Sequence, residues 1–196
     1  MKNIFNSVCF KFVFFGMFML QSLNCIAQEM PLPVEDQVPL FIKILNYDRS
    51  LKNRDDDKVV IGIIYQEKFR KSDITKDEFL NSIQDISDNT INGKPVECIP
   101  VEVSNLQNLD RIIDSRNISV LYVAPLRSIE INRIYHISRR KKVITISGVS
   151  KYIREGISVG LELVDEKPKI LINRKASKNE GIDFTSQLLR LAILIN

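Results

Sequence analysis

From residue 36 onwards, apolar runs alternate with amphipathic segments. Val59–Tyr65 is a continuous, β-branched apolar run without alternation, typical of a strand covered on both faces. The segments on either side of it repeat their apolar residues at helical spacing. The predicted strands are Val59–Tyr65, Pro95–Val103, Ser119–Ala124 and Val143–Ser147, and the predicted helices are Asp36–Leu51, Ile74–Ile86, Leu106–Asp114, Leu126–Ser138 and Lys151–Glu155.

This alternation predicts an α/β fold, because parallel strands need helical crossovers. Pro95 and Pro100 remove backbone donors from the second strand and favour an edge position for it. With right-handed crossovers, the four strands numbered along the chain then take the order 2-1-3-4. We therefore expect a three-layer sandwich built on a largely parallel, doubly wound sheet.

The last third of the chain has a different pattern. Two apolar runs, Ile157–Val164 and Ile170–Ile172, flank a polar, proline-containing turn and predict a β-hairpin. Arg174–Glu180 then reads as a short polar helix ended by Gly181. Thr185–Ile195 places its apolar residues on one face and predicts a last helix. The hairpin should complete the far side of the sheet.

The order of these C-terminal pieces is distinctive: a run opened by glycines, a strand ending in an Ile-Asn pair, an Ala-containing helix, a glycine and a Phe-Thr-Ser-Gln-Leu-Leu-Arg-Leu-Ala segment. The residues that carry it are Gly156, Gly160, Ile172, Asn173, Ala176, Gly181 and Phe184–Ala192. In this order the chain resembles the YfiR family, over roughly residues 38–195. The resemblance implies a periplasmic regulator that binds the outward-facing sensor portion of an inner-membrane diguanylate cyclase and holds it inactive.

Residues 1–27 are predicted to be a signal peptide. Two lysines accompany the apolar run Phe12–Leu20, and the small residues Cys25 and Ala27 suit the positions before a cut at Gln28. The run has nine residues, well short of the roughly 20 that a membrane-spanning helix needs. Asn24 argues against lipidation of Cys25. We expect export to the periplasm, a linker over residues 28–35 and one domain over residues 36–196.

Composition and charge narrow the classes of function. The chain has 28 Lys and Arg against 24 Asp and Glu, and residues 1–27 hold two lysines and no acid, so the exported part has a net charge of 26 − 24 = +2. A nucleic-acid binder would normally carry a concentrated basic face. The one basic run, Arg139–Lys142, ends a predicted helix, where cations are favoured. Nucleic acid is therefore not an expected partner.

Cysteine use gives a further restriction. Only Cys98 remains after the signal peptide, so the exported chain cannot form an internal disulfide. Members of the YfiR family often carry paired cysteines, and this sequence departs from that pattern. We expect Cys98 to act as a small buried apolar residue.

Candidate binding residues come from the predicted topology, because ligands of such sheets meet the carboxyl ends of the strands where strand order reverses. The candidates are Tyr65, Gln66, Lys68, Pro125, Arg127, Ser147 and Ser150. No glycine-rich turn follows the first strand, so a dinucleotide or phosphate loop is not expected there. The exported chain has one histidine, His136, and one thiol, Cys98, which makes a transition-metal site improbable. We therefore expect no catalytic residue, no metal and no cofactor.

Two functions of different classes remain open. The first is an interaction protein that represses a membrane signalling enzyme; its partner would be a membrane protein with a periplasmic sensor domain, either a diguanylate cyclase or a histidine kinase, and the chain could form a homodimer. The second is a periplasmic solute-binding module that feeds a membrane sensor kinase or a transporter. An exposed apolar patch would favour the first and a closed polar pocket the second.

Overall fold

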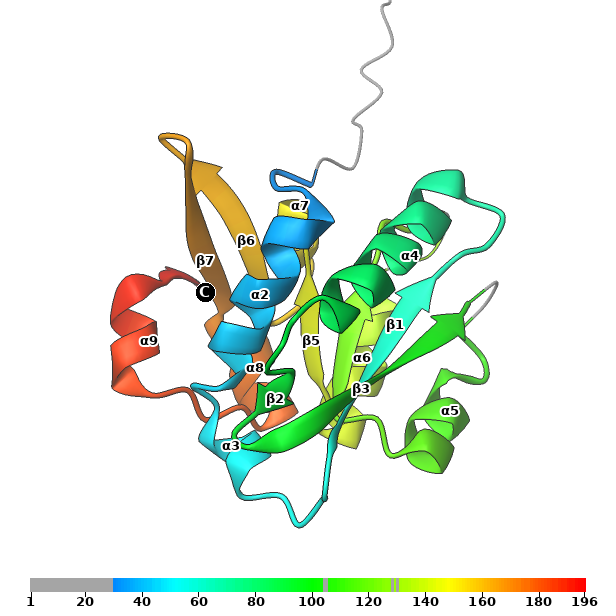
Figure 1. Cartoon of the computed structure of the whole chain (residues 1–196), viewed down its shortest axis with the longest axis horizontal. Helices are drawn as coiled ribbons and strands as arrows, with labels where there is room; N and C mark the ends of the chain where they lie inside the picture. Colours follow the sequence, from blue (N-terminus) through cyan, green and yellow to red (C-terminus); the bar gives the residue numbers. More distant parts are fainter. Residues whose placement is uncertain (1–29, 104–105, 128, 130) are drawn as a thin grey trace, which may run out of the picture.

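The computed structural model describes residues 30–103, 106–127, 129 and 131–196. The predicted signal peptide lies outside these residues. Within them, eight strands form a single sheet in the order β2-β3-β1-β4-β5-β6-β7-β8 (Figure 1). The strands are β1 (Val59–Tyr65), β2 (Thr90–Ile91), β3 (Lys94–Glu102), β4 (Val120–Val123), β5 (Ile144–Ser147), β6 (Val159–Val164), β7 (Lys167–Asn173) and β8 (Ile193–Ile195).

The predicted strand order is confirmed. The four predicted strands correspond to β1, β3, β4 and β5, and their order in the sheet is β3-β1-β4-β5 with every neighbour parallel. β6 continues the parallel series beside β5, and β6 and β7 form the predicted antiparallel hairpin. The edge position of β3 holds for most of its length, because β2 pairs only with Lys94 and Pro95.

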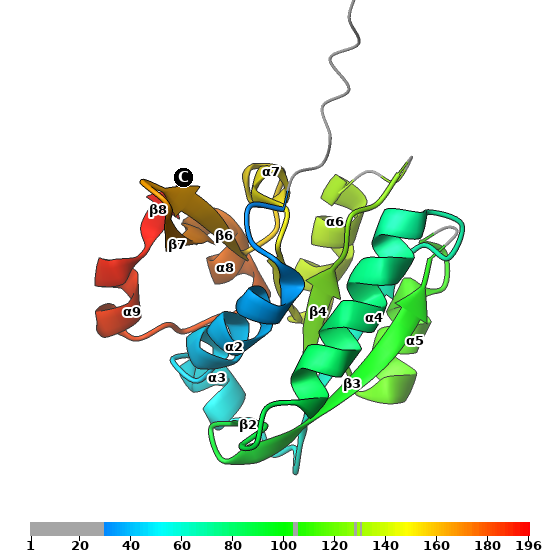
Figure 2. The same cartoon turned by 45° about the horizontal axis from the view of Figure 1, so that its top comes forward.

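Helices cover both faces of the sheet. They are α2 (Val34–Leu45), α3 (Arg49–Lys52), α4 (Arg70–Gln84), α5 (Leu109–Arg116), α6 (Ile131–Lys141), α7 (Ser150–Arg154), α8 (Arg174–Glu180) and α9 (Ser186–Leu191). Helices α2 and α4 lie on one face, and α5 and α6 lie on the other (Figures 1 and 2). This is the α/β sandwich that the sequence predicts.

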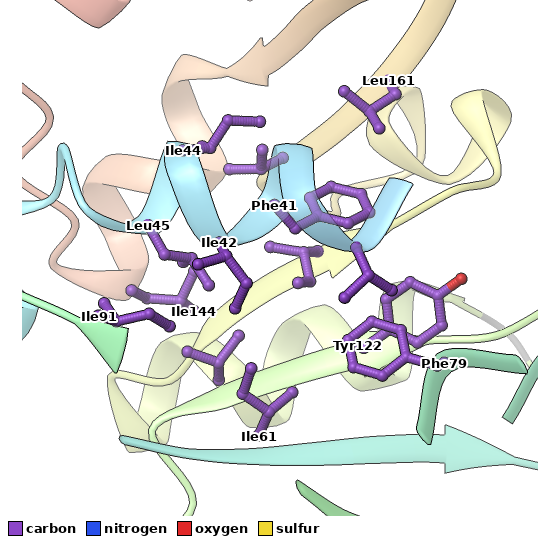
Figure 3. Packing of buried hydrophobic residues seen from close by; sticks show 14 of the residues in the cluster. Phe41, Ile42, Ile44, Leu45, Ile61, Phe79, Ile91, Tyr122, Ile144 and Leu161 are labelled. Atoms are coloured by element: carbon purple, nitrogen blue, oxygen red, sulfur yellow. The ribbon is translucent and has the colours of Figure 1, made fainter. Parts of the chain in front are cut away.

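The central strands are buried on both faces because successive side chains point to opposite sides of a strand. Ile61 and Ile63 of β1 join the core beneath α2 and α4, whereas Val60 and Ile64 join the core beneath α5, α6 and α7. Figure 3 shows the first core, in which residues of α2 meet β1, β4 and β5. The unbroken apolar run of β1 is thus explained by two hydrophobic cores.

The C-terminal hairpin closes with a two-residue turn. Asp165 and Glu166 both have positive φ, at 49° and 59°, and Val164 pairs directly with Lys167. Two successive residues in this conformation match the right-handed twist of the strands. Gly181 ends α8 in the left-handed region with φ 82°, as its position in the sequence predicts.

The prediction of one last helix over Thr185–Ile195 is wrong in its second half. Thr185 does cap a helix, but α9 ends at Leu191, Ala192 is extended, and Ile193–Ile195 forms β8, parallel to β7. A short Ile-Leu-Ile run has the composition of a strand, and the free edge of β7 offers it backbone partners. The free edge of the sheet therefore decides whether Ile193–Ile195 continues the helix or forms a strand.

The predicted first helix, Asp36–Leu51, is also corrected. It is divided into α2 and α3 at Asp48, whose carboxylate accepts hydrogen bonds from the backbone N–H groups of Ser50 and Leu51 and caps α3. The same carboxylate accepts from the Asp183 N–H at 2.9 Å. Asp48 is buried, so the break in the helix also fastens the C-terminal segment to the N-terminal one.

Candidate functional site at the carboxyl edge of the sheet

The loops that follow β1 and β4 contact each other directly, as their positions in the sheet require. The Gln66 side-chain oxygen accepts from the Arg127 backbone N–H at 2.6 Å, and the Gln66 Nε2 donates to the Arg127 carbonyl at 3.0 Å. The Arg127 guanidinium lies over the Phe69 ring, 4.2 Å from its centroid. The structure thus brings two candidate residues together, with the Arg127 guanidinium beside them.

Tyr65 is the last residue of β1, and Lys68 lies in the loop that follows it. The Lys76 ammonium lies 4.7 Å from the centroid of the Tyr65 ring. Burial raises the pKa of Tyr65 above its ordinary value, against an opposing effect from Lys76. Hydrogen bonds to Asp73 and then Asp77 raise the pKa of Lys76, so this ammonium stays charged. Lys68 is exposed.

The remaining candidates hold neighbouring backbone in place. Ser147 is buried; its hydroxyl donates to the Val123 carbonyl at 2.7 Å and accepts from the Val149 N–H at 3.1 Å. Ser150 donates to the Leu161 carbonyl at 2.7 Å. Pro125 is buried. In this structure both hydroxyls link strands and helix starts, so they are engaged within the fold.

A residue that sequence reasoning missed fills the edge of the sheet above β4 and β5. Gln37 of α2 is fully buried; its Nε2 donates to the Leu32 carbonyl at 2.6 Å, and its Oε1 accepts from the Tyr122 hydroxyl at 3.3 Å. A Cβ added to Gly148 would lie 2.0 Å from the Gln37 Oε1. The glycine after β5 is therefore required by the close approach of Gln37.

Aromatic rings complete this filling. The Phe79 ring lies 4.3 Å and the Phe41 ring 6.0 Å from the Tyr122 ring, between centroids. Figure 3 shows the three rings together between the helices and the sheet. Burial raises the pKa of Tyr122, so its hydroxyl stays protonated. On this side, the space above β4 and β5 is therefore occupied by side chains of the chain itself.

Two hollows flank residues 31–33, the stretch that leads into α2. One, of about 600 Å³, lies between this stretch and α4, where Lys71, Glu78 and Asp85 line it. The other, of about 530 Å³, lies between the start of α2 and the β6–β7 hairpin. Both are open at the surface and lie outside the predicted crevice.

A cluster of four buried hydrogen bonds to one ionisable group lies on the opposite side of the sheet, at Glu180 of α8. This carboxyl is 2% exposed. Its Oε1 accepts from the hydroxyls of Ser138 at 2.6 Å and Thr145 at 2.8 Å. Its Oε2 accepts from the Thr145 N–H at 2.9 Å and from the Ser158 hydroxyl. Burial raises the pKa of Glu180 to about 7, although these hydrogen bonds oppose the rise.

Other reactive side chains have ordinary structural roles. His136 is exposed on α6, with its Nδ1 2.6 Å from an Arg139 nitrogen. Cys98 packs against the core, and burial raises the pKa of its thiol to about 12, which keeps it protonated and unreactive. The described part of the chain contains no group of three or more His, Cys, Asp or Glu side chains placed to hold a metal ion.

None of the helices in the described residues is both long and apolar enough to cross a membrane.

The architecture is an α/β sandwich, with helices on both faces of a mostly parallel sheet. A family model described as YfiR/HmsC-like matches residues 44–193. The chain belongs to this family, which confirms the resemblance drawn from its C-terminal segment. A search of curated proteins finds no match.

Solved structures share the fold at low sequence identity. An ABC domain in complex with L-Trp from Streptococcus pneumonia has a TM-score of 0.57 and 15% identity, covering 84% of this chain and 62% of that chain. A conserved domain protein from Vibrio cholerae has a TM-score of 0.57 and 14% identity, with 84% and 60% covered. The ligand-free, open structure of a substrate binding protein with adhesive properties from Clostridium difficile has a TM-score of 0.55 and 15% identity, again with 84% and 60% covered. This chain therefore spans about three fifths of each neighbour.

Proposed function

We propose that this protein is an exported, non-catalytic regulator that binds the periplasmic part of an inner-membrane diguanylate cyclase and represses it. Membership of the YfiR/HmsC-like family is the observation that carries the proposal. Binding would act as a population shift: the regulator favours the inactive form of its partner by its higher affinity for that form. A sensor histidine kinase is the alternative partner.

Two features of the surface and interior support a protein partner. The carboxyl edge above β4 and β5 is filled by Gln37, Tyr122 and Phe79. Exposed large apolar side chains gather in the C-terminal segment instead. Among the described residues they are Leu163, Val164, Leu191, Ile193 and Leu194, with Ile74 elsewhere on α4. Leu191, Ile193 and Leu194 are neighbours at the end of α9 and in β8, and adjacent exposed apolar side chains are typical of an interaction surface.

The second candidate is a periplasmic solute-binding module. It is favoured by one observation, the fold shared with a substrate binding protein and with a domain solved in complex with L-Trp. This chain spans about three fifths of those proteins, and it offers open hollows rather than an enclosed pocket. Thermal unfolding with and without L-Trp separates the two candidates, because a bound ligand raises the melting temperature.

The test of the proposal is the cellular level of cyclic di-GMP, measured by mass spectrometry in the host bacterium. Deletion of the gene should raise this level, and expression of the full chain should restore it. A chain that begins at Gln28, without the predicted signal, is the matched control and should not restore it. An unchanged level after deletion contradicts repression of a cyclase, and restoration by the signal-less chain contradicts action in the periplasm.

A further inference from the structure

The hollow between α2 and the β6–β7 hairpin is an apolar groove with stiff walls. Its apolar lining includes Pro39 and Leu40 on the helix and Leu163 and Pro168 on the hairpin. The stretch at residues 31–33, which contains two further prolines, forms its third side. Proline fixes φ and reduces the freedom of these walls, so the groove is largely formed before anything binds. Figure 1 shows the hairpin standing beside α2, with its tip reaching past the start of the helix.

The register of the hairpin decides which side chains face the groove. Leu163 pairs with Pro168, and both lie on the sheet face that carries α2, as Leu161 does. Val164 pairs with Lys167, so these two side chains point to the opposite face. Leu163 is 42% exposed and Val164 is 36% exposed. Two adjacent apolar residues of similar exposure therefore differ in one respect, the face on which they lie.

The charge on the groove has one sign. Its charged lining consists of Glu35, Asp36 and Glu166, and no lysine or arginine of the described residues lines it. All three side chains are exposed, and none has an ion-pair partner within the described residues. Glu35 and Asp36 also lie in the first turn of α2, where the helix dipole favours negative charge. Glu166 has no such role, because it lies in the hairpin turn.

We propose that this groove binds a polypeptide segment of a partner protein in which an apolar side chain is flanked by lysine or arginine. The apolar side chain would lie on Leu40, Leu163 and Pro168, and the flanking cations would meet the three carboxylates. Opposite charges at the rim of an interface speed association and set its orientation. The inference rests on the proposed function, for which it identifies the chemistry of the binding surface.

Site-specific photocrosslinking tests where the partner binds. A benzoylphenylalanine replaces Leu163 in the full chain, expressed in its host, and the same replacement at Val164 is the matched control. We expect a crosslink at position 163 well above that at position 164, to a segment rich in lysine or arginine. A crosslink to a second copy of this chain, to the residues before Met30, or to an uncharged or acidic segment overturns the proposal, as does equal crosslinking at both positions.

A binding assay tests the chemistry without knowledge of the partner. The probe is a fluorescein-labelled peptide of alternating leucine and lysine, compared by anisotropy with a peptide that has glutamate for lysine. The lysine peptide should bind, more weakly as salt rises. Leu163→Ser and Glu166→Lys should each weaken it by about ten-fold or more, whereas Val164→Ser should not. Equal binding of the two peptides, or binding of neither, overturns the proposal.

The outcomes also separate this inference from the proposed function. A crosslink to a diguanylate cyclase through some other surface, with no signal at position 163, would contradict binding at the groove and leave the repressor function supported. A crosslink at position 163 to a protein without cyclase or kinase output would support binding at the groove and contradict the proposed function.

Discussion

Replacing Glu180 by glutamine should make the stability of the protein less dependent on pH. The Glu180 carboxyl is buried among three hydroxyls and one N–H group, and its described contacts are all neutral. Burial raises its pKa from an ordinary 4.5 to about 7. The folded protein therefore holds a proton on this group over a range of pH in which the unfolded chain has lost it.

The sign follows from this difference. Between the two pKa values the folded state binds more protons than the unfolded state, so the free energy of unfolding falls as pH rises through this range. Below the lower value both states are protonated and the group costs nothing. Above the higher value both are ionised, and the folded state has the full cost of a buried carboxylate. A pKa shift from 4.5 to about 7 corresponds to a loss of about 3 kcal/mol in the free energy of unfolding.

The hydrogen bonds show that a neutral side chain fits here. The Ser138 hydroxyl lies 3.0 Å from the Tyr135 carbonyl as well as 2.6 Å from Glu180 Oε1. One hydroxyl has one hydrogen, so a protonated carboxyl can donate to Ser138 while Ser138 donates to the carbonyl. Glutamine can place its NH₂ group at this position and its oxygen opposite the Thr145 N–H. We therefore expect Glu180→Gln to fold with the same core.

The assay is urea unfolding followed by circular dichroism at several pH values from about 5 to about 8. The free energy of unfolding of Glu180→Gln should rise relative to that of the parent by about 2 to 3 kcal/mol between pH 5 and pH 8. Glu67→Gln, a change to an exposed carboxylate, is the control and should run parallel to the parent. A variant that loses stability relative to the parent at high pH would show that the ionised Glu180 stabilises the fold, which contradicts this prediction.

Three further substitutions or modifications test other contacts. Gly148→Ala should destabilise the protein by about 2 kcal/mol in the same urea assay, because its Cβ would displace Gln37 from its bonds to Leu32 and Tyr122; a loss below about 0.5 kcal/mol would show that Gln37 can move freely. Asp48→Ala should cost about 2 kcal/mol, since it removes the cap of α3 and the bond to Asp183, and Asp88→Ala is its exposed control. Cys98 should react slowly with iodoacetamide in the native protein and rapidly in urea, as measured on its peptide by mass spectrometry, because burial raises its pKa to about 12; equal rates would contradict this.

Local pattern was sufficient to predict most of the fold. Three features were predicted correctly: the apolar run of β1, the hairpin and the glycine that ends α8. In each of them the local preferences of the residues agree with the final conformation. The last segment was not predicted correctly, because its sequence fits two structures. Ala192 and Ile195 continue the helical spacing of Leu188, whereas Ile193–Ile195 also has the composition of a strand. What decides is the open edge of β7, and its position depends on the whole sheet.

Topology alone predicted which candidate residues lie close together. The loops after β1 and β4 had to be neighbours, and Gln66 and Arg127 are indeed bonded. Gln37 and Glu180 were missed, because each sits in a helix that reads as amphipathic or polar and each is buried by elements far along the chain. A glycine directly after β5 was the one local sign of a close approach, and it did not name the residue that approaches.

The filled edge of the sheet and the open groove are linked through one side chain. Gln37 donates to the Leu32 carbonyl, and Leu32 belongs to the stretch that forms one wall of the groove. This buried hydrogen bond therefore also helps to position one wall of the proposed groove. If the groove binds its partner segment as proposed, changes at Gln37 should alter that binding although Gln37 is buried, and a ligand that displaced Gln37 would act on the partner without touching it.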